Sequence, residues 1–159
     1  MAKALKDGRA IKVIDLDYCP VEAPIVADRL RTYAERNGIA VVEDARMPEA
    51  WEGWSNPNRG IIALRAGMPP VQTMRVLIHE LVHVLDESSH QAEHNGPSEA
   101  APQTADWILS AVTGNGRPDD VAMREGQYFA WKGVAENAGR SGTIAICQLY
   151  KAICEQGAS

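Results

Sequence analysis

Apolar residues recur at intervals of three and four along much of the chain, which predicts amphipathic helices. The first of these helices follows Val21 and stops at Gly38, a residue type common at helix ends. The positions that share its apolar face are Val26, Leu30, Tyr33 and Asn37. A second helix is expected over residues 71–86, because the two prolines at 69 and 70 suit a first helical turn and the periodicity continues after them.

The rest of the chain predicts three further helices. The first covers residues 101–113, with Gly114 suited to cap its end. Its aligned apolar positions are Ala105, Ile108, Leu109 and Val112. Two more helices are expected near residues 119–138 and 142–155, with Ser141 as the N-cap of the second.

Three short segments have the Val-, Ile- and Leu-rich composition of β-strands: residues 9–18, 39–43 and 60–65. Between the last two, residues 44–59 are full of turn formers and predict a long loop that carries Trp51 and Trp54. Loops of this length often form lids or binding loops. The two tryptophans would equally serve to fold this loop back onto a core.

These elements predict an α+β fold, in which a short mixed or antiparallel sheet packs on the helix at residues 71–86 and the C-terminal half is helical. The chain of 159 residues shows no internal repeat and no convincing linker. We therefore expect residues 1–159 to form one domain.

Composition narrows the class of protein. The formal charge of −5 argues against a nucleic-acid binder that relies on bulk positive charge. No apolar run is long enough for a transmembrane helix, and the first residues lack the apolar stretch of a secretory signal. Both features favour a protein of the cytoplasm that has no membrane partner.

The three cysteines also favour the cytoplasm. Cys19, Cys147 and Cys154 form no CxxC pair and cannot all be bridged, which suits a reducing compartment. Cys147 and Cys154 lie seven residues apart on an expected helix, so we interpret both as core thiols.

The clearest chemical motif lies within the helix at residues 71–86. His79-Glu80-Leu81-Val82-His83 matches the pattern HExxH. Residues i and i+4 project from one helical face, so both imidazoles can reach a single zinc ion. Glu80 is rotated by about 100° from His79, which suits it to act as the general base beside the metal rather than as a ligand.

The rest of this helix fits that interpretation. One stripe is apolar and would hold the helix on the core: Met74, Leu77, Ile78, Leu81 and Leu85. A second stripe, on the opposite side, carries polar and ionisable residues: Gln72, Arg75, His79, His83 and Asp86. Core-filling histidines would belong to the first stripe, yet both lie in the second.

A catalytic zinc site needs a third protein ligand and an open position for water and substrate. The metzincin extension HExxHxxGxxH is absent, because Asp86 and Ser89 occupy its glycine and final histidine positions. Glu99 precedes the next expected helix, which would return it to the histidines by packing antiparallel. A charge that favours a helix N-terminus is the alternative role of Glu99. Other candidate ligands are Glu93, Asp86, Asp106 and His90.

A second histidine pattern follows. His90 to His94 reads HQAEH and matches the inverted motif HxxEH. It lies in a Ser-, Asn- and Gly-rich stretch without an apolar stripe, which favours an exposed segment over a second metal site. His90 or His94 would then contribute to substrate binding at the cleft.

These residues resemble the ImmA/IrrE-type metallopeptidases, in which a strand leads into a helix reading roughly TLxHELxH. The matching residues are GIIALR at 60–65 and MRVLIHELVH at 74–83. SEAAPQTA at 98–105 is similar to the ExEAxxxA segment, whose glutamate completes the metal site. YFAW at 128–131 and its helices look like phage and actinobacterial relatives, including the protease-like part of ArdC antirestriction proteins.

The alignment departs from this family at one point. When it is fixed on Ala101 and Ala105, the glutamate positions of the family fall on Ser98 and Ala100, and Glu99 lies between them. A shift of one residue restores Glu99, and Pro102 is unusual there.

The resemblance implies a zincin-like domain of the gluzincin type that hydrolyses a peptide bond in a protein substrate, often a regulatory protein. His79, His83 and Glu99 would hold Zn²⁺, and Glu80 would activate water. The strand at residues 60–65 would be the edge along which an extended substrate pairs. Candidate oxyanion donors are Tyr128, His94 and Arg124. The alternative is a non-catalytic binding or antirestriction module that keeps the metal site; the oligomeric state stays open.

Overall fold

The structure is a computed structural model that describes residues 16, 18–86, 100–115 and 127–155. The strand predicted at residues 9–18 lies almost entirely outside this part of the chain. The described residues form an α+β fold, which is the class that the sequence predicts, with four helices and a small mixed sheet.

The sheet contains the strands β1 (Ala40–Asp44), β2 (Gly53–Asn56) and β3 (Ile61–Arg65). Their order is β1-β3-β2, with β1 parallel and β2 antiparallel to β3. Two predictions are therefore wrong. The segment at residues 44–59 is not all loop, because it contains β2. The strand at residues 60–65 is not an edge, because β3 pairs on both sides and β2 is the edge strand on the side of the sheet away from β1.

Two helices end where their glycines predict. Helix α2 (Ala23–Arg36) is followed by Gly38, whose φ of 74° is left-handed. The Gly38 and Ile39 N–H groups donate to the carbonyls of Glu35 and Ala34, at 3.1 and 2.8 Å. This is a Schellman motif, which satisfies carbonyl groups at the helix end. Gly114, with a φ of 81°, ends α4 (Ala100–Val112) in the same way.

The C-terminal helix differs from the prediction. Helix α6 (Gln127–Cys154) is continuous, so the expected break near residue 140 is wrong. Ser141 is not an N-cap but lies within the helix, where its hydroxyl donates to the carboxylate of Asp86. This contact ties α6 to the end of α3 (Pro70–Leu85).

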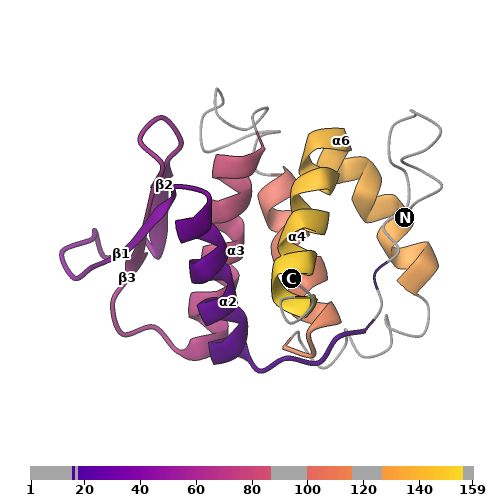
Figure 1. Ribbon diagram of the computed structural model, residues 1–159, viewed down its shortest axis with the longest axis horizontal. Helices are drawn as coiled ribbons and strands as arrows, with labels where there is room; N and C mark the ends of the chain where they lie inside the picture. Colours follow the sequence, from indigo (N-terminus) through magenta and orange to yellow (C-terminus); the bar gives the residue numbers. More distant parts are fainter. Residues whose placement is uncertain (1–15, 17, 87–99, 116–126, 156–159) are drawn as a thin grey trace.

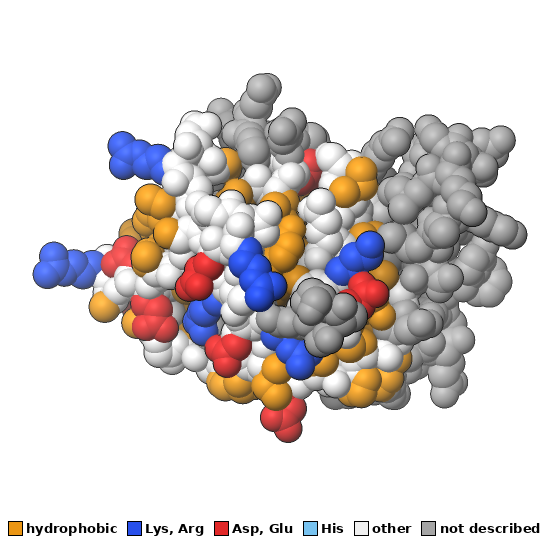
Figure 2. Space-filling view, viewed as in Figure 1, with side chains coloured by type: hydrophobic (Ala, Val, Ile, Leu, Met, Phe, Trp, Pro, Cys, Tyr) orange, Lys and Arg blue, Asp and Glu red, His pale blue; other side chains and the backbone are white. Residues whose placement is uncertain are grey.

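Helix α3 occupies the middle of the structure. The sheet lies at one end of the molecule, beside α2 and α3, and α4 and α6 lie toward the other end (Figure 1). Helix α3 packs against all three of the other helices and against β2 and β3. On the face in Figure 2, acidic and basic side chains are interspersed over the described residues. No helix in the described part of the chain is long and apolar enough to cross a membrane.

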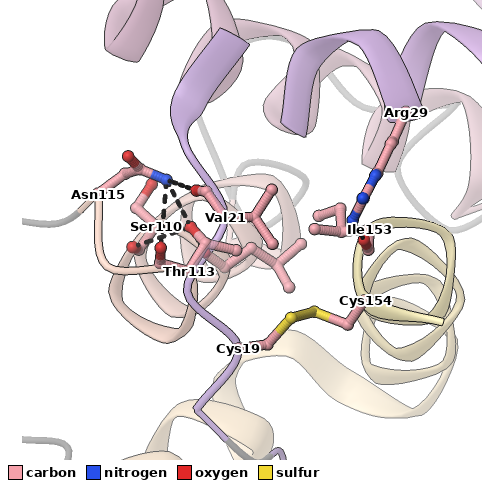
Figure 3. Close-up of a disulfide and its surroundings, with 9 residues drawn as sticks. Cys19, Val21, Arg29, Ser110, Thr113, Asn115, Ile153 and Cys154 are labelled. Carbon is pink, nitrogen blue, oxygen red and sulfur yellow. Dashed lines mark hydrogen bonds between the residues drawn. A yellow bond between two sulfur atoms is a disulfide. The ribbon is translucent and has the colours of Figure 1, made fainter. Parts of the chain in front are cut away.

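A disulfide links the segment before α2 to the end of α6. Cys19 is bonded to Cys154, and the hydrogen bonds around them hold the same segment against α4 (Figure 3). The prediction that Cys154 is a core thiol is therefore wrong, and so is the interpretation that the cysteines are unbridged thiols suited to a reducing compartment. Cys147 is buried and lies outside the disulfide, as expected.

Candidate functional site

The apolar stripe of α3 is confirmed as the side that fixes this helix in the protein. Its members Met74, Leu77, Ile78 and Leu81 are fully buried, and Leu85 is half-buried. The polar stripe is less enclosed, because Gln72, Arg75, His79 and His83 are all half-buried and only its last member, Asp86, is buried. Helix α3 therefore has one side anchored in the core and a polar side that solvent partly reaches.

The two histidines of the motif lie side by side on that polar side. Their ring centroids are 5.0 Å apart and their ring planes are inclined by 66°. Two imidazoles that bind one tetrahedral zinc ion through Zn–N bonds of about 2.0–2.1 Å place their ring centroids about 5 Å apart. The spacing of this pair therefore fits a shared metal ion without rearrangement of the helix.

The side chain of Glu80 lies where α3 packs against the edge strand β2. The residue is only 9% exposed. A Cβ atom added to Gly53 would lie 3.6 Å from the Glu80 Cγ and only 2.7 Å from a methyl group of Val76. The missing side chain at position 53 thus allows β2 to approach α3 closely, directly over the glutamate of the motif.

A cleft of about 1130 Å³ opens between these elements. One wall is the chain from Ala50 to Ser55, which includes most of β2, and the other is α3 from Val71 to Glu80. His79 and Glu80 both line it, and His83 lies one helical turn beyond. The cleft therefore places an imidazole and a carboxylate beside a strand edge, an arrangement suited to chemistry on an extended chain.

Arg75 and Asp106 form an ion pair on the floor of this cleft. The Arg75 Nε donates to one Asp106 oxygen at 2.8 Å, and an Nη donates to the other at 3.3 Å. Ser110 also donates to Asp106, at 3.3 Å. The carboxylate of Asp106, one of the candidate metal ligands, is therefore engaged by Arg75. One sign of this pair is local, since Arg75 lies one turn before His79 on the same stripe.

Of the other candidate metal ligands, only Asp86 lies among the described residues. Asp86 is 1% exposed and accepts the Ser141 hydrogen bond, so its carboxylate is turned toward α6. Glu99, Glu93 and His90 lie outside the described residues. Within residues 16, 18–86, 100–115 and 127–155, no three His, Cys, Asp or Glu residues are grouped closely enough to hold a metal ion. The described residues therefore supply two imidazoles, and Glu99 stays a prediction.

The candidate oxyanion donors cannot be placed in the same way. His94 and Arg124 lie outside the described residues, as does the side chain of Tyr128, whose backbone belongs to α6. The donor that would stabilise a developing negative charge thus stays open among these three residues.

Comparison of the chain with protein-family models, with curated proteins and with solved structures finds no match. The resemblance to the ImmA/IrrE-type peptidases accordingly rests on the motif and its flanking residues.

Proposed function

We propose that this chain is a zinc-dependent endopeptidase with a zincin-like fold. One observation carries the proposal: two imidazoles stand side by side on the polar side of α3, and the carboxylate between them in sequence lines a cleft beneath a strand edge. His79 and His83 would hold the zinc ion. Zinc bound there would supply a Lewis acid that lowers the pKa of water and polarises a carbonyl group.

Packing between α3 and α4 supports Glu99 as the third ligand. The two helices lie side by side and run in opposite directions (Figure 1). Asp106 pairs with Arg75, which fixes their register. At about 1.5 Å per residue, His83 lies about 12 Å beyond Arg75, and the first residue of α4 lies about 9 Å before Asp106. The start of α4 is therefore roughly level with His83, and Glu99 is the residue that precedes it.

Glu80 is suited to move the proton. Its carboxylate would accept a proton from the water that attacks the scissile carbonyl carbon, and would return it to the amine nitrogen as the C–N bond breaks. Burial beneath Gly53 restricts the side chain, so the carboxylate is held in place before a substrate arrives.

The substrate would lie along β2 rather than β3. An extended peptide adds to a sheet through backbone hydrogen bonds at an edge strand, and β2 is the edge that borders the cleft. Such backbone pairing is independent of side chains, which suits a protease that acts on an extended segment of a protein.

Replacing Glu80 by Gln tests this function. We expect Glu80→Gln to keep zinc, because the ligands are unchanged, and to lower peptide cleavage by at least about 100-fold, because the proton acceptor is lost. Metal content and cleavage of a fluorogenic peptide library are the two measurements, with Gln72→Ala as a control on the same side of α3. A variant that keeps zinc and full cleavage would contradict the proposed role. Wild-type protein that binds zinc and cleaves nothing would favour the non-catalytic module.

A further inference from the structure

The cleft continues beyond His79 and Glu80 into an apolar region near the start of α3. Trp51 is 49% exposed and Val71 is 40% exposed, and both line this cleft. Pro69, which is also exposed, completes this end. A tryptophan that served only to fold its segment onto the core would be largely buried. Exposed apolar residues that gather within one cleft are typical of a surface that binds something apolar.

The backbone that carries Trp51 is held firmly in place. The Arg65 side chain donates from Nε to the Trp51 carbonyl at 2.7 Å and from an Nη to the Pro48 carbonyl. The Arg65 N–H also donates to the carbonyl of Glu52, at 2.8 Å, which extends the pairing of β2 with β3. One arginine thus ties the segment on both sides of Trp51 to the central strand. A backbone segment that is already ordered loses little conformational freedom when its side chains bind a ligand.

The charged residues that line the cleft do not favour an acidic ligand, because Glu52 and Glu80 are carboxylates and the Arg75–Asp106 pair adds no net charge. Arg75 and Asp106 contribute opposite charges and neutralise each other through two hydrogen bonds. Recognition next to this pair would therefore depend on apolar contact with Trp51 and Val71. A large aromatic or aliphatic side chain has the size and polarity that such a surface buries best.

The spacing along the strand gives the position of this side chain. Gly53 lies against Glu80, and Trp51 is two residues before Gly53. Trp51 precedes β2 and the chain bends at Glu52, so at about 3.3 Å per residue these two residues span at most about 7 Å. A substrate residue that contacts Trp51 would then lie within about two residues of the bond beside Glu80.

We propose that Trp51, whose backbone is held by Arg65, is a specificity-determining residue that selects substrates with a large apolar side chain within about two residues of the scissile bond. This inference rests on the proposed function, because only a peptidase would have such a substrate. The preference itself concerns binding, so it is measured without catalysis.

The test uses zinc-loaded Glu80→Gln protein and a fluorescently labelled library of random decapeptides. Bound peptides are recovered and sequenced for this protein and for two derivatives that carry Trp51→Ala or Val42→Ala. Val42 is a matched control, because it is 45% exposed on β1 and lies outside the cleft. A Trp51→Phe derivative keeps an aromatic ring, and circular dichroism verifies that each variant folds.

We expect bound peptides to be enriched about tenfold in Phe, Tyr, Trp, Leu or Met at one position. Val42→Ala and Trp51→Phe should keep this enrichment, and Trp51→Ala should abolish it. The inference is overturned if no position is enriched, if nothing binds, or if Trp51→Ala binds like Val42→Ala. Incubation of the same library with wild-type protein separates the two proposals. Selected peptides that stay uncut would contradict the peptidase alone, whereas cleavage without any preference would contradict the role of Trp51 alone.

Discussion

Reduction of the Cys19–Cys154 disulfide is expected to lower the free energy of unfolding substantially. The bond joins residues that are 135 positions apart, so it closes almost the whole chain into a loop. In the chain-entropy model, a crosslink of that span removes about 17 cal/mol/K of entropy from the unfolded chain. At 25 °C this corresponds to about 5 kcal/mol of stability.

The folded state should change little when the bond is broken. The Cys19 N–H donates to the Val112 carbonyl at 2.9 Å, and the Val21 N–H donates to the Thr113 carbonyl at 3.1 Å. The amide group of Asn115 also donates to the Val21 carbonyl, at 2.7 Å (Figure 3). These contacts hold the segment before α2 without the disulfide. The loss of stability would therefore arise mainly from the unfolded chain.

Urea unfolding, followed by tryptophan fluorescence with and without an excess of reductant, measures this effect. The control is the double variant Cys19→Ser/Cys154→Ser, whose unfolding midpoint should not respond to the reductant. It should match the reduced wild type. A difference of less than about 1 kcal/mol between oxidised and reduced wild type would refute the reasoning, because it falls far below the value of about 5 kcal/mol that the chain-entropy model gives for this span.

Two further predictions concern Gly53 and Cys147. Gly53→Ala should destabilise the protein by about 1–3 kcal/mol, because its Cβ would meet Val76 at 2.7 Å. In urea unfolding, Val76→Ala should cost less in that variant than in wild type; equal costs would contradict this packing. Burial raises the pKa of the Cys147 thiol to about 11. The neutral thiol is thus favoured, and at pH 8 only about one thiol in a thousand is ionised, against about a quarter for an ordinary cysteine. Alkylation by iodoacetamide should rise about tenfold per pH unit up to about pH 11; a plateau near pH 8.5 would contradict this.

The helix that carries the motif was predictable because its signals are local. Two prolines begin α3, and its apolar residues recur at helical spacing over four turns. The stops at Gly38 and Gly114 are equally local, since each needs only a left-handed residue. Where neighbouring residues specify the backbone conformation, the sequence was sufficient to predict the helix and its end.

Features that depend on distant residues were not predictable. The strand β2 reads GWSN, a composition with little intrinsic preference for a strand, and it forms because it pairs with β3. Its position at the edge follows from strand order, which no local pattern encodes. Ser141 lies inside α6 and contacts Asp86, a residue 55 positions away in sequence, and no local pattern encodes that contact. The disulfide likewise requires a fold that brings the two ends of the chain together.

The zinc content of the purified protein tests the central claim most directly. The measurement is elemental analysis of wild type, His83→Ala, Glu99→Ala and the control Gln72→Ala, each after addition of zinc and removal of the excess. We expect about one equivalent in wild type and in the control, less than about 0.1 in His83→Ala, and weakened binding in Glu99→Ala. Wild-type protein with less than about 0.1 equivalents, or a His83→Ala variant with a full equivalent, would contradict the proposed metal site.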